Sequence, residues 1–575
     1  MGELITGAEA LMKCLVAESV DRVFGYPGGS IMPVYDKLYN YENEILHVLT
    51  RHEQGAVHAA QGYARATGKT GVVIATSGPG AMNLVTGIAD AKIDSTPLVI
   101  ITGQVGTGVL GTDAFQETDM IDVANPISKW GIQLRSAEEI PDVISRAFFI
   151  ANSGRPGPVV IDFPKNVQTE MMEWTDYKTC SYIRTYNHRP EINEYSISKA
   201  AALINSAERP LILAGHGVTI AGAERLLGEL AEKADIPVAV TLLGLSVMPS
   251  KHPLFKGMLG MHGNIAPNIA TNRADVIIAI GMRFDDRVVC RVKDYAPNAQ
   301  IVHIDIDASE IGRIVPTQLP INADAKDALE ALLPLVNNAN HKEWLDLFSK
   351  LEKIEDQKVH SRQLNRRSSE SMGMGEVVDA VAGAVNDDAI LVTDVGQNQM
   401  FAAKYFRFSS PRSMISSGGL GTMGFGIPAA IGAKMGCPDR IVCLFTGDGG
   451  FQMTMQELGT IMEYNVKVKI IILNNNFLGN VRQWQELFFN SRFSQTKLLN
   501  PDFIKLAEAY GIKGEDVGTR EELQAAVQRM IRHDGSYILN VNIDEKDMIF
   551  PMIPLGAAVD EILLDKEERL DVLHL

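Results

Sequence analysis

The sequence has few cysteines, and none of them are spaced as a metal or disulfide motif. Its five cysteines, Cys14, Cys180, Cys290, Cys437 and Cys443, are scattered over 575 residues. No Cys-x-x-Cys occurs, so the sequence predicts neither a zinc site nor a disulfide framework. This pattern fits a protein of the reducing cytoplasm.

Positive charge and long apolar runs are also scarce. The chain carries 53 Lys and Arg against 70 Asp and Glu, a formal net charge of −17 at pH 7. That balance argues against nucleic acid or an anionic membrane surface as a main partner. No uninterrupted apolar run reaches the ~18 residues of a membrane span, and the amino terminus looks like an acidic amphipathic helix rather than a signal peptide. We therefore expect a cytoplasmic protein that binds neither nucleic acid nor a membrane.

The strongest local pattern lies between residues 441 and 477. An apolar run, Ile441–Phe445, leads into the turn Gly447–Gly450, and an amphipathic segment follows. A second strand pattern, Val466–Leu473, then ends in three asparagines. The order predicts a strand, a loop, a helix and a second strand.

This unit brings one carboxylate and one amide together. Parallel strands of a βαβ unit end at the same edge of the sheet, so Asp448 and Asn475 should lie near each other. Their oxygens suit Mg²⁺ that is held partly by a substrate's phosphates, and the glycines let backbone N–H groups approach an anion. The alternative is an ordinary βα turn with a surface aspartate.

The first 170 residues alternate apolar runs with helical patterns, which predicts a parallel α/β sheet. The layout of residues 72–104 echoes that of 441–475, so two domains of one type are expected at the two ends of the chain. Glu53 falls in the first turn of a predicted helix, directly after a strand. A carboxylate there has a simpler explanation, since it favours the helix dipole.

The middle of the chain has a different α/β pattern. Pro210–Ala214 precedes Gly215-His216-Gly217, but Ile220 stands where a dinucleotide-binding turn has its third glycine. Acidic residues after strands, such as Asp305, commonly meet ribose hydroxyls. The sequence thus predicts three doubly wound parallel-sheet domains, at residues 1–180, 190–345 and 375–575, the last with a carboxyl-terminal tail. Residues 171–195 and 335–375 are expected to be linkers.

The motifs in order resemble the thiamine-diphosphate enzymes, and in particular the catalytic large subunits of acetohydroxyacid synthase, also called biosynthetic acetolactate synthase. The resemblance covers nearly the whole chain. It rests on FGYPGG, RHEQGAVHAAQGYARATG, ATSGPGAMNLVTGIADA, GTDAFQETD, SGRPGPVVIDFPK, GMLGMHG, RFDDR, SSGGLGTMGFGIPAA and the QW of NVRQWQELFF. Each motif is weak alone, but nine in order are specific.

The resemblance implies three cofactors: thiamine diphosphate, Mg²⁺ and FAD. Mg²⁺ would take Asp448, Asn475 and the backbone carbonyl of Phe477. Thiamine diphosphate would contact one terminal domain at Tyr26, Gly29, Glu53, Thr76, Pro79 and Asn83, and the other at Val395, Gly396, Gln397, Gly421, Met423, Gly447 and Gly449. FAD would contact Arg155, Gly215, Gly217, Thr241, Leu242, Leu259, Gly260, Met261, His262, Gly281, Arg283, Asp285, Arg287, Val288, Asp305, Ile306, Asp324 and Ala325.

Roles in the reaction follow by position. Glu53 would protonate the aminopyrimidine ring, and Met423 would bend the cofactor. Substrate handling would fall to Gly28, Phe115, Gln116, Lys165, Arg283 and Trp484. The implied reaction decarboxylates pyruvate and joins its hydroxyethyl unit to a second pyruvate, giving 2-acetolactate, or to 2-oxobutyrate, giving 2-aceto-2-hydroxybutyrate. Taken singly, Lys165 is also explained as a solvated lysine and Trp484 as a core residue.

The resemblance also implies partner subunits, and it leaves other functions of the same cofactor class open. Sites of this class span two subunits, so a homodimer or homotetramer is expected, and many members bind a small regulatory subunit. Asn480, Gly106 and Asn398 depart from the family's usual methionine, proline and histidine. Asn480 would border the substrate entrance and so bears on the choice of acceptor, and Gly106 and Asn480 would lie near the family's herbicide site. A catabolic acetolactate synthase without FAD and a pyruvate oxidase stay open within the cofactor class. A catalytically dead scaffold is disfavoured, because Glu53, Asp448 and Asn475 are all present.

Overall fold

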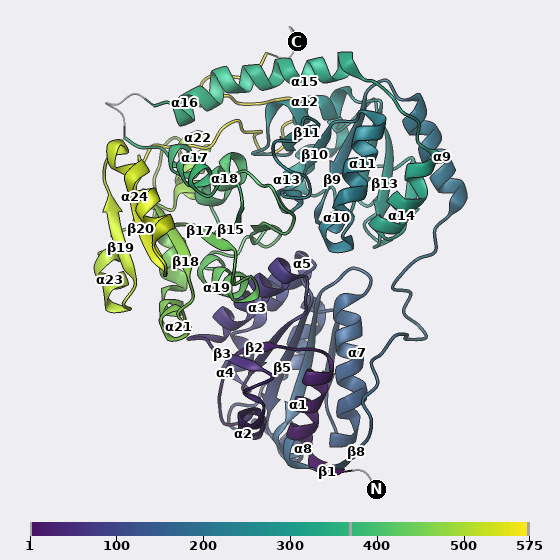
Figure 1. Ribbon diagram of the computed structural model, residues 1–575, viewed down its shortest axis with the longest axis vertical. Helices are drawn as coiled ribbons and strands as arrows, with labels where there is room; N and C mark the ends of the chain where they lie inside the picture. Colours follow the sequence, from purple (N-terminus) through teal and green to yellow (C-terminus); the bar gives the residue numbers. More distant parts are fainter. Residues whose placement is uncertain (1–2, 367–370, 572–575) are drawn as a thin grey trace.

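The computed structural model describes residues 3–366 and 371–571, which build three six-stranded sheets and one two-stranded sheet. Figure 1 shows three α/β blocks, with the amino-terminal block below the other two. All strand pairs in the three large sheets are parallel. Among the described residues, none of the helices combines the length and apolar character that a membrane crossing requires.

The amino-terminal sheet has the order β3-β2-β4-β5-β7-β6. Its strands are β2 (Arg22–Tyr26), β3 (Leu46–Leu49), β4 (Gly71–Ala75), β5 (Leu98–Gln104), β6 (Trp130–Gln133) and β7 (Pro158–Pro164). Its helices are α1 (Gly7–Ala17), α2 (Met32–Leu38), α3 (Glu53–Thr67), α4 (Pro79–Met82), α5 (Val85–Ile93), α6 (Met120–Ala124), α7 (Ile140–Asn152) and α8 (Lys165–Thr169). Every residue of β4, β5 and β7 is buried, as expected for strands covered by helices on both faces.

The carboxyl-terminal sheet repeats that strand order, as β16-β15-β17-β18-β20-β19. Its strands are β15 (Ala389–Thr393), β16 (Met414–Ile415), β17 (Ile441–Gly447), β18 (Val468–Asn474), β19 (Lys513–Val517) and β20 (Tyr537–Asn542). Its helices are α17 (Met374–Ala384), α18 (Gln397–Tyr405), α19 (Gly426–Gly436), α20 (Asp448–Met453), α21 (Leu458–Tyr464), α22 (Gly479–Phe488), α23 (Phe503–Ala509) and α24 (Arg520–Arg532). The prediction of two like domains at the ends of the chain is confirmed.

The central sheet has the order β11-β10-β9-β12-β13-β14, which is the dinucleotide-binding order 3-2-1-4-5-6. Its strands are β9 (Pro210–Ala214), β10 (Val238–Val240), β11 (Phe255–Met258), β12 (Val276–Ile280), β13 (Gln300–Asp305) and β14 (Leu319–Asn322). Its helices are α9 (Glu194–Ser206), α10 (His216–Ala221), α11 (Glu224–Ala234), α12 (Ile265–Arg273), α13 (Asp286–Val289) and α14 (Ala325–Leu332). All three sheets are therefore doubly wound, as predicted.

The segments expected to be linkers are more ordered than the sequence suggested. In the first, β8 (Met171–Trp174) pairs antiparallel with β1 (Glu3–Thr6). In the second, α15 (Lys342–Glu355) packs on the central domain, and Trp344 Nε1 donates to Pro210 O at 2.8 Å; residues 367–370 of that segment lie outside the described residues. β8 is only four residues long and its partner strand is distant in the chain, so nothing local marks it. Helical character was expected in 335–375, but not the packing of α15 on a domain.

The carboxyl-terminal tail also crosses to the central domain. Ile553 N donates to Met261 O at 2.8 Å, and Phe550 and Met552 join the apolar core around α12 and α15. The tail thus supports a loop of the central domain, although it follows the carboxyl-terminal sheet in the chain.

Helices α3 and α19 join the two terminal domains at a close crossing (Figure 1). A Cβ on Gly62 would come within 2.0 Å of Ala429 O, and one on Gly432 within 1.8 Å of Ala59 O. Only glycine allows the two backbones to approach this closely. Because α3 begins at Glu53, the crossing also fixes where that carboxylate stands.

We predict that Gly432→Ala destabilises the protein by roughly 1–3 kcal/mol through overpacking at this crossing. Gly228→Ala is the control, since a Cβ there meets nothing within 4 Å in the middle of α11. That change should be neutral or stabilising by up to ~1 kcal/mol. Thermal unfolding midpoints measure both, and equal midpoints for the two variants would contradict the prediction.

Candidate active site

In the carboxyl-terminal domain, polar groups cluster where the connections between strands change direction. β15 and β17 are adjacent, and each ends in a glycine turn, at Gly396 and at Gly447. β18 lies next to β17 in register, so Asn475 follows β18 at the same edge where Asp448 follows β17. This is the topological switch point at which open α/β sheets bind ligands.

Asp448 is tied to the asparagine turn by a residue that sequence analysis missed. Asn500 Nδ2 donates to Asp448 Oδ2 at 2.7 Å and to Asn474 Oδ1 at 3.0 Å. Asp448 is only 1% exposed, and burial raises the pKa of its carboxyl group to about 6. A bound cation would favour the ionised form and reverse that shift.

Further predicted residues surround this turn. Asn475 Nδ2 donates to Gln397 Oε1 at 3.4 Å, and Phe477 N donates to Asn475 Oδ1 at 3.2 Å. A Cβ on Gly449 would lie 3.8 Å from the methyl of Met423, so that side chain reaches over the turn. A Cβ on Gly421 would meet Val395 Cγ1 at 3.9 Å. The predicted carboxyl-terminal residues therefore form one cluster.

The amino-terminal domain gathers a second cluster around Glu53. Glu53 is the first residue of α3, and Asn83 Nδ2 donates to its Oε2 at 2.9 Å. A Cβ on Gly80 would come within 3.1 Å of Glu53 Oε1 and 2.7 Å of Thr76 Cγ2. Pro79, the first residue of α4, stands beside them, so four predicted residues and Gly80 share this spot.

The carboxyl-terminal domain of the same chain supports the Glu53 turn. Arg51 N donates to both carboxylate oxygens of Glu457, at 3.0 and 3.1 Å. Glu457 is fully buried, and Thr460 Oγ1 donates to it at 2.7 Å. Nothing in the sequence around Glu457 marks this role, because its partner Arg51 lies 406 positions away.

The remaining amino-terminal residues lie at the same sheet edge. A Cβ on Gly28 would come within 2.6 Å of Thr76 Cβ, whereas one on Gly29 would meet nothing within 4 Å. Tyr26 is 40% exposed and Phe115 is 87% exposed. A Cβ on Gly78 would come within 2.8 Å of the carbonyl oxygen of Gln116, and Lys165 follows β7 on the surface.

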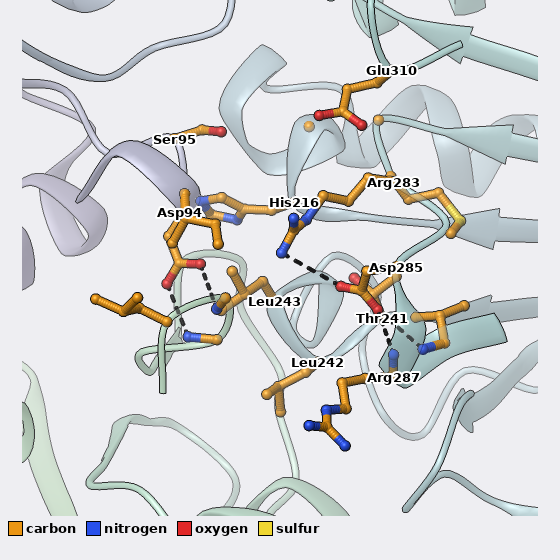
Figure 2. A pocket seen from close by; sticks show the side chains of 18 of the residues that line it. Asp94, Ser95, His216, Thr241, Leu242, Leu243, Arg283, Asp285, Arg287 and Glu310 are labelled. Atoms are coloured by element: carbon orange, nitrogen blue, oxygen red, sulfur yellow. Dashed lines mark hydrogen bonds and ion pairs between the residues drawn. The ribbon is translucent and has the colours of Figure 1, made fainter. Parts of the chain in front are cut away.

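A cavity of about 740 Å³ lies at the switch point of the central sheet. Figure 2 shows Asp94 approaching it from the amino-terminal domain, and Arg283 and Asp285 from the central domain. Gly418–Gly421 and Trp484 of the carboxyl-terminal domain complete its wall. All three domains thus contribute to one cavity of the size that holds a small molecule or cofactor.

The cavity wall mixes fixed charges of both signs. Arg155 Nη1 donates to Glu310 Oε1 at 2.7 Å, and its Nε donates to Ser95 Oγ at 2.9 Å. Asp285 caps α13 by accepting from Arg287 N and Val288 N, at 3.1 and 3.0 Å. Burial raises the pKa of Asp305 to about 6.

Buried polar groups also face this region. Burial lowers the pKa of His262 to about 4, so its ring is neutral at pH 7. Among the described residues, His262 Nδ1 and Asn480 Oδ1 are buried polar atoms without a hydrogen-bond partner. Both residues line the cavity, so a polar ligand there could satisfy them.

Sixteen of the eighteen residues predicted to contact FAD line this cavity, and the other two are Gly215 and Gly260. Those two pack beneath the wall instead. A Cβ on Gly215 would come within 2.3 Å of Gly281 O, and one on Gly260 within 2.5 Å of Arg287 O. Arg283 and Trp484 line the same cavity, whereas its lining does not include Glu53, Phe115, Gln116 or Lys165.

Comparison with known proteins defines the class. The chain matches three models of thiamine pyrophosphate enzymes: the N-terminal TPP binding domain over residues 5–123, the central domain over 197–332 and the C-terminal TPP binding domain over 394–541. This is a thiamine pyrophosphate enzyme, and thiamine pyrophosphate (thiamine diphosphate) is its cofactor.

Relatives that align over nearly the whole chain identify the family within this class. The chain is 45% identical to the probable acetolactate synthase large subunit of Methanocaldococcus jannaschii, over 97% of this chain and 95% of that protein. It is 42% identical to the acetolactate synthase large subunit of Haemophilus influenzae, over 98% and 99% of the two chains. It is 41% identical to the acetolactate synthase isozyme 3 large subunit of Escherichia coli, over 99% and 100%. The chain belongs to the acetolactate synthase large-subunit family.

We predict that Asp448→Asn stabilises the cation-free protein above pH 6. The pKa of the folded carboxyl group, about 6, lies above its ordinary value of 3.8, so protonation stabilises the fold. That stabilisation is complete below the ordinary pKa and is lost as the pH rises through about 6. The ionised carboxylate then costs about 3 kcal/mol, which the neutral amide avoids.

Thermal unfolding at pH 8 and pH 4, without divalent cations, measures this effect. The variant should unfold at a higher temperature than the parent at pH 8 and at an equal one at pH 4. Asp439→Asn, at an exposed carboxylate before β17, is the control and should change neither value. A parent more stable than Asp448→Asn at pH 8 would refute a buried charge whose hydrogen bonds do not offset the cost of burial.

Proposed function

We propose that this chain is the catalytic subunit of an acetolactate synthase of branched-chain amino-acid biosynthesis. It would take two molecules of pyruvate to 2-acetolactate and carbon dioxide, or pyruvate and 2-oxobutyrate to 2-aceto-2-hydroxybutyrate and carbon dioxide. The observation that carries this proposal is the pair of polar clusters at the switch points of two like sheets, one around Asp448 and one around Glu53. They suit the two ends of one thiamine diphosphate.

The diphosphate end fits the carboxyl-terminal cluster. Asp448, Asn475 and the carbonyl oxygen of Phe477 are a carboxylate, an amide and a peptide oxygen, the hard oxygen donors that Mg²⁺ prefers. Within the described residues, no cluster of three His, Cys, Asp or Glu side chains forms a metal site. A magnesium ion at Asp448 would thus depend on the cofactor's phosphates for further ligands. Gly447 and Gly449 leave backbone N–H groups open to those phosphates.

The aminopyrimidine end of the cofactor fits the amino-terminal cluster around Glu53. When bound, thiamine diphosphate supplies a thiazolium carbon that adds to a 2-keto acid and holds the electron pair released on decarboxylation. Glu53 would hold the proton at a ring nitrogen, and Asn83 orients its carboxyl group through the 2.9 Å bond to Oε2. Met423 would wedge the cofactor, since its side chain reaches over the Gly449 turn.

FAD fits the central cavity. The sheet order, the acid at the end of β13 and the unpaired polar atoms of His262 and Asn480 all suit a dinucleotide. We propose that the predicted FAD residues at the cavity wall hold it, with Arg155 and Arg287 near its phosphates. The absorbance spectrum of the purified protein tests this. A flavin-free protein would favour a catabolic acetolactate synthase, and flavin bleaching during turnover would favour a pyruvate oxidase.

Substrate handling would involve two groups of residues. Gly28, Phe115, Gln116 and Lys165 would surround the reacting carbonyls from the amino-terminal domain. Arg283 would anchor the carboxylate of the second keto acid, and Trp484 would contact the methyl that distinguishes 2-oxobutyrate from pyruvate. Asn480 lines the cavity near Trp484 and would share in that choice.

We further propose that the complete site forms between two copies of the chain, in a homodimer or homotetramer. Exposed apolar side chains stand beside both half-sites: Tyr26 and Phe115 in one domain, Met453 and Leu499 in the other. Such clusters are typical of interfaces. The relatives are named large subunits, which supports a small regulatory partner. The five cysteines are free thiols, which supports a location in the cytoplasm.

We predict that Glu53→Gln lowers kcat by about 10²–10⁴-fold, because the amide cannot deliver the proton. The variant should keep its fold, its flavin and its affinity for Mg²⁺. Glu42→Gln, at an exposed glutamate of the same domain, should behave as the parent. Steady-state production of acetolactate and a flavin spectrum measure both. Full turnover by Glu53→Gln would remove Glu53 from the mechanism.

We predict that Trp484→Leu lowers the preference for 2-oxobutyrate over pyruvate by about tenfold, through lost apolar contact with the extra methyl. Product analysis with both keto acids in competition gives the ratio. Trp174→Leu is the control, because Trp174 lies in β8 of another domain. An unchanged product ratio would show that Trp484 is only a packing residue.

A further inference from the structure

One loop of the carboxyl-terminal domain reaches both cofactor sites. Residues 416–424, between β16 and α19, carry Met423 over the Gly449 turn. Gly418, Gly419, Leu420 and Gly421 of the same loop line the central cavity. We call residues 416–424 the shared loop. Its four glycines give it little rigidity of its own, so its position must come from what holds it.

The holders are two buried carboxylates of another domain. Asp94, which follows α5, accepts from Gly418 N at 2.9 Å on one oxygen and from Gly419 N at 2.7 Å on the other (Figure 2). Asp90, one turn earlier in α5, accepts from the hydroxyl groups of Ser417 and Thr422. Ser417 Oγ in turn accepts from Thr422 N at 2.8 Å, so the two ends of the loop are fastened together.

One guanidinium group balances these carboxylates. Arg65, near the end of α3, lies 3.0 Å from Asp94 Oδ2 and 3.9 Å from Asp90 Oδ2. Its Nη1 also donates to Ser416 O, the first carbonyl of the shared loop. The side chains of all three are at most 4% exposed, so three charges are buried where two domains meet.

Buried ions are an expensive way to join domains. Their desolvation cancels much of their attraction, and an apolar contact of equal volume is often as stable. What the ions add is geometry, because both oxygens of Asp94 and one oxygen of Asp90 accept from defined donors of the shared loop. The far end of the loop is fixed in a similar way by its own domain, where Asp394 accepts from Gly424 N and Gly426 N.

We propose that Asp90 and Asp94 are positioning residues of the reaction, which hold the shared loop so that Met423 meets thiamine diphosphate and Gly418–Gly421 form the wall of the central cavity. Arg65 holds both carboxylates in place. The proposal rests on the proposed function for its effect on turnover, but its effect on cofactor binding does not depend on the substrate.

The two carboxylates should respond differently to the same substitution. Both oxygens of Asp94 accept from backbone N–H groups, so Asp94→Asn would turn an NH₂ group toward one of those donors. Hydrogen bonds to the loop reach only Oδ1 of Asp90, and Oδ2 is a buried atom without a hydrogen-bond partner among the described residues. An amide at position 90 can therefore keep both bonds to the loop.

The test uses the full-length protein and compares Asp94→Asn, Asp90→Asn and Asp90→Ala with the parent. Affinity for thiamine diphosphate in excess Mg²⁺ is measured by fluorescence quenching, and kcat and KM with pyruvate. Asp94→Asn and Asp90→Ala should weaken thiamine diphosphate binding by about 10- to 100-fold. At saturating cofactor, kcat should fall by about 100-fold for a loop displaced by about 1 Å, with less change in KM. Asp90→Asn should stay within about tenfold of the parent.

Controls separate this role from simple folding. Asp142→Asn, at an exposed carboxylate of the same domain, should match the parent. Ser417→Ala removes the hydroxyl bond to Asp90 without touching a buried charge, and should weaken thiamine diphosphate binding even if Asp94→Asn fails to fold. Equal effects of the Asp90→Asn and Asp94→Asn substitutions, or a lower unfolding temperature with unchanged cofactor affinity and kcat, would overturn the proposal. If the parent makes no acetolactate, the proposed function fails, while the binding data still decide the role of the loop.

Discussion

The direction in which each sheet is wound determines where this protein can do chemistry. In all three large sheets the strand order reverses between two adjacent parallel strands, and the connections on either side leave in opposite directions. Backbone N–H groups and short polar side chains then face an open crevice. Asp448, Glu53 and the glycines of the central cavity all stand at or beside such a point. The fold therefore provides three crevices, whatever side chains line them.

Burial makes several carboxylates of this protein costly to ionise. Burial raises the pKa of Asp448, Asp305 and Asp90 to about 6 in each case. A carboxylate that is costly to ionise alone gains most from a cation or a hydrogen-bond donor. All three accept hydrogen bonds from donors within the chain, and in the proposed function Asp448 would also bind a metal ion and Asp305 a ribose hydroxyl. In the proposed function, a buried carboxylate would thus position a loop between domains at Asp90 and bind a ligand at Asp448 and Asp305.

The sequence was sufficient for the architecture, because the architecture depends on local patterns. Local patterns also placed Asp448 and Asn475, whereas most other candidate site residues were implied by the family resemblance. Apolar runs that end in glycine turns mark strands of a parallel sheet, and the position of Asp448 or Glu53 follows from the strand before it. Asp94, Glu457 and Asn500 were not predicted as site residues, since their partners are distant in the chain and nothing local marks them. The strand β8 and the crossing of the tail to the central domain were missed for the same reason. Contacts between domains leave no local pattern in a single sequence.

Helix α3 shows how those hidden contacts connect the parts. It begins at Glu53, carries Gly62 at the crossing with α19, and reaches Arg65 beside the shared loop. A rigid helix rises about 1.5 Å per residue, so its two ends act about 18 Å apart. In the proposed dimer, Glu53 would serve a cofactor bound by the partner, while Arg65 positions the loop of its own chain. One helix would then align parts of two active sites, which gives a physical reason for the close glycine contacts that fix its position.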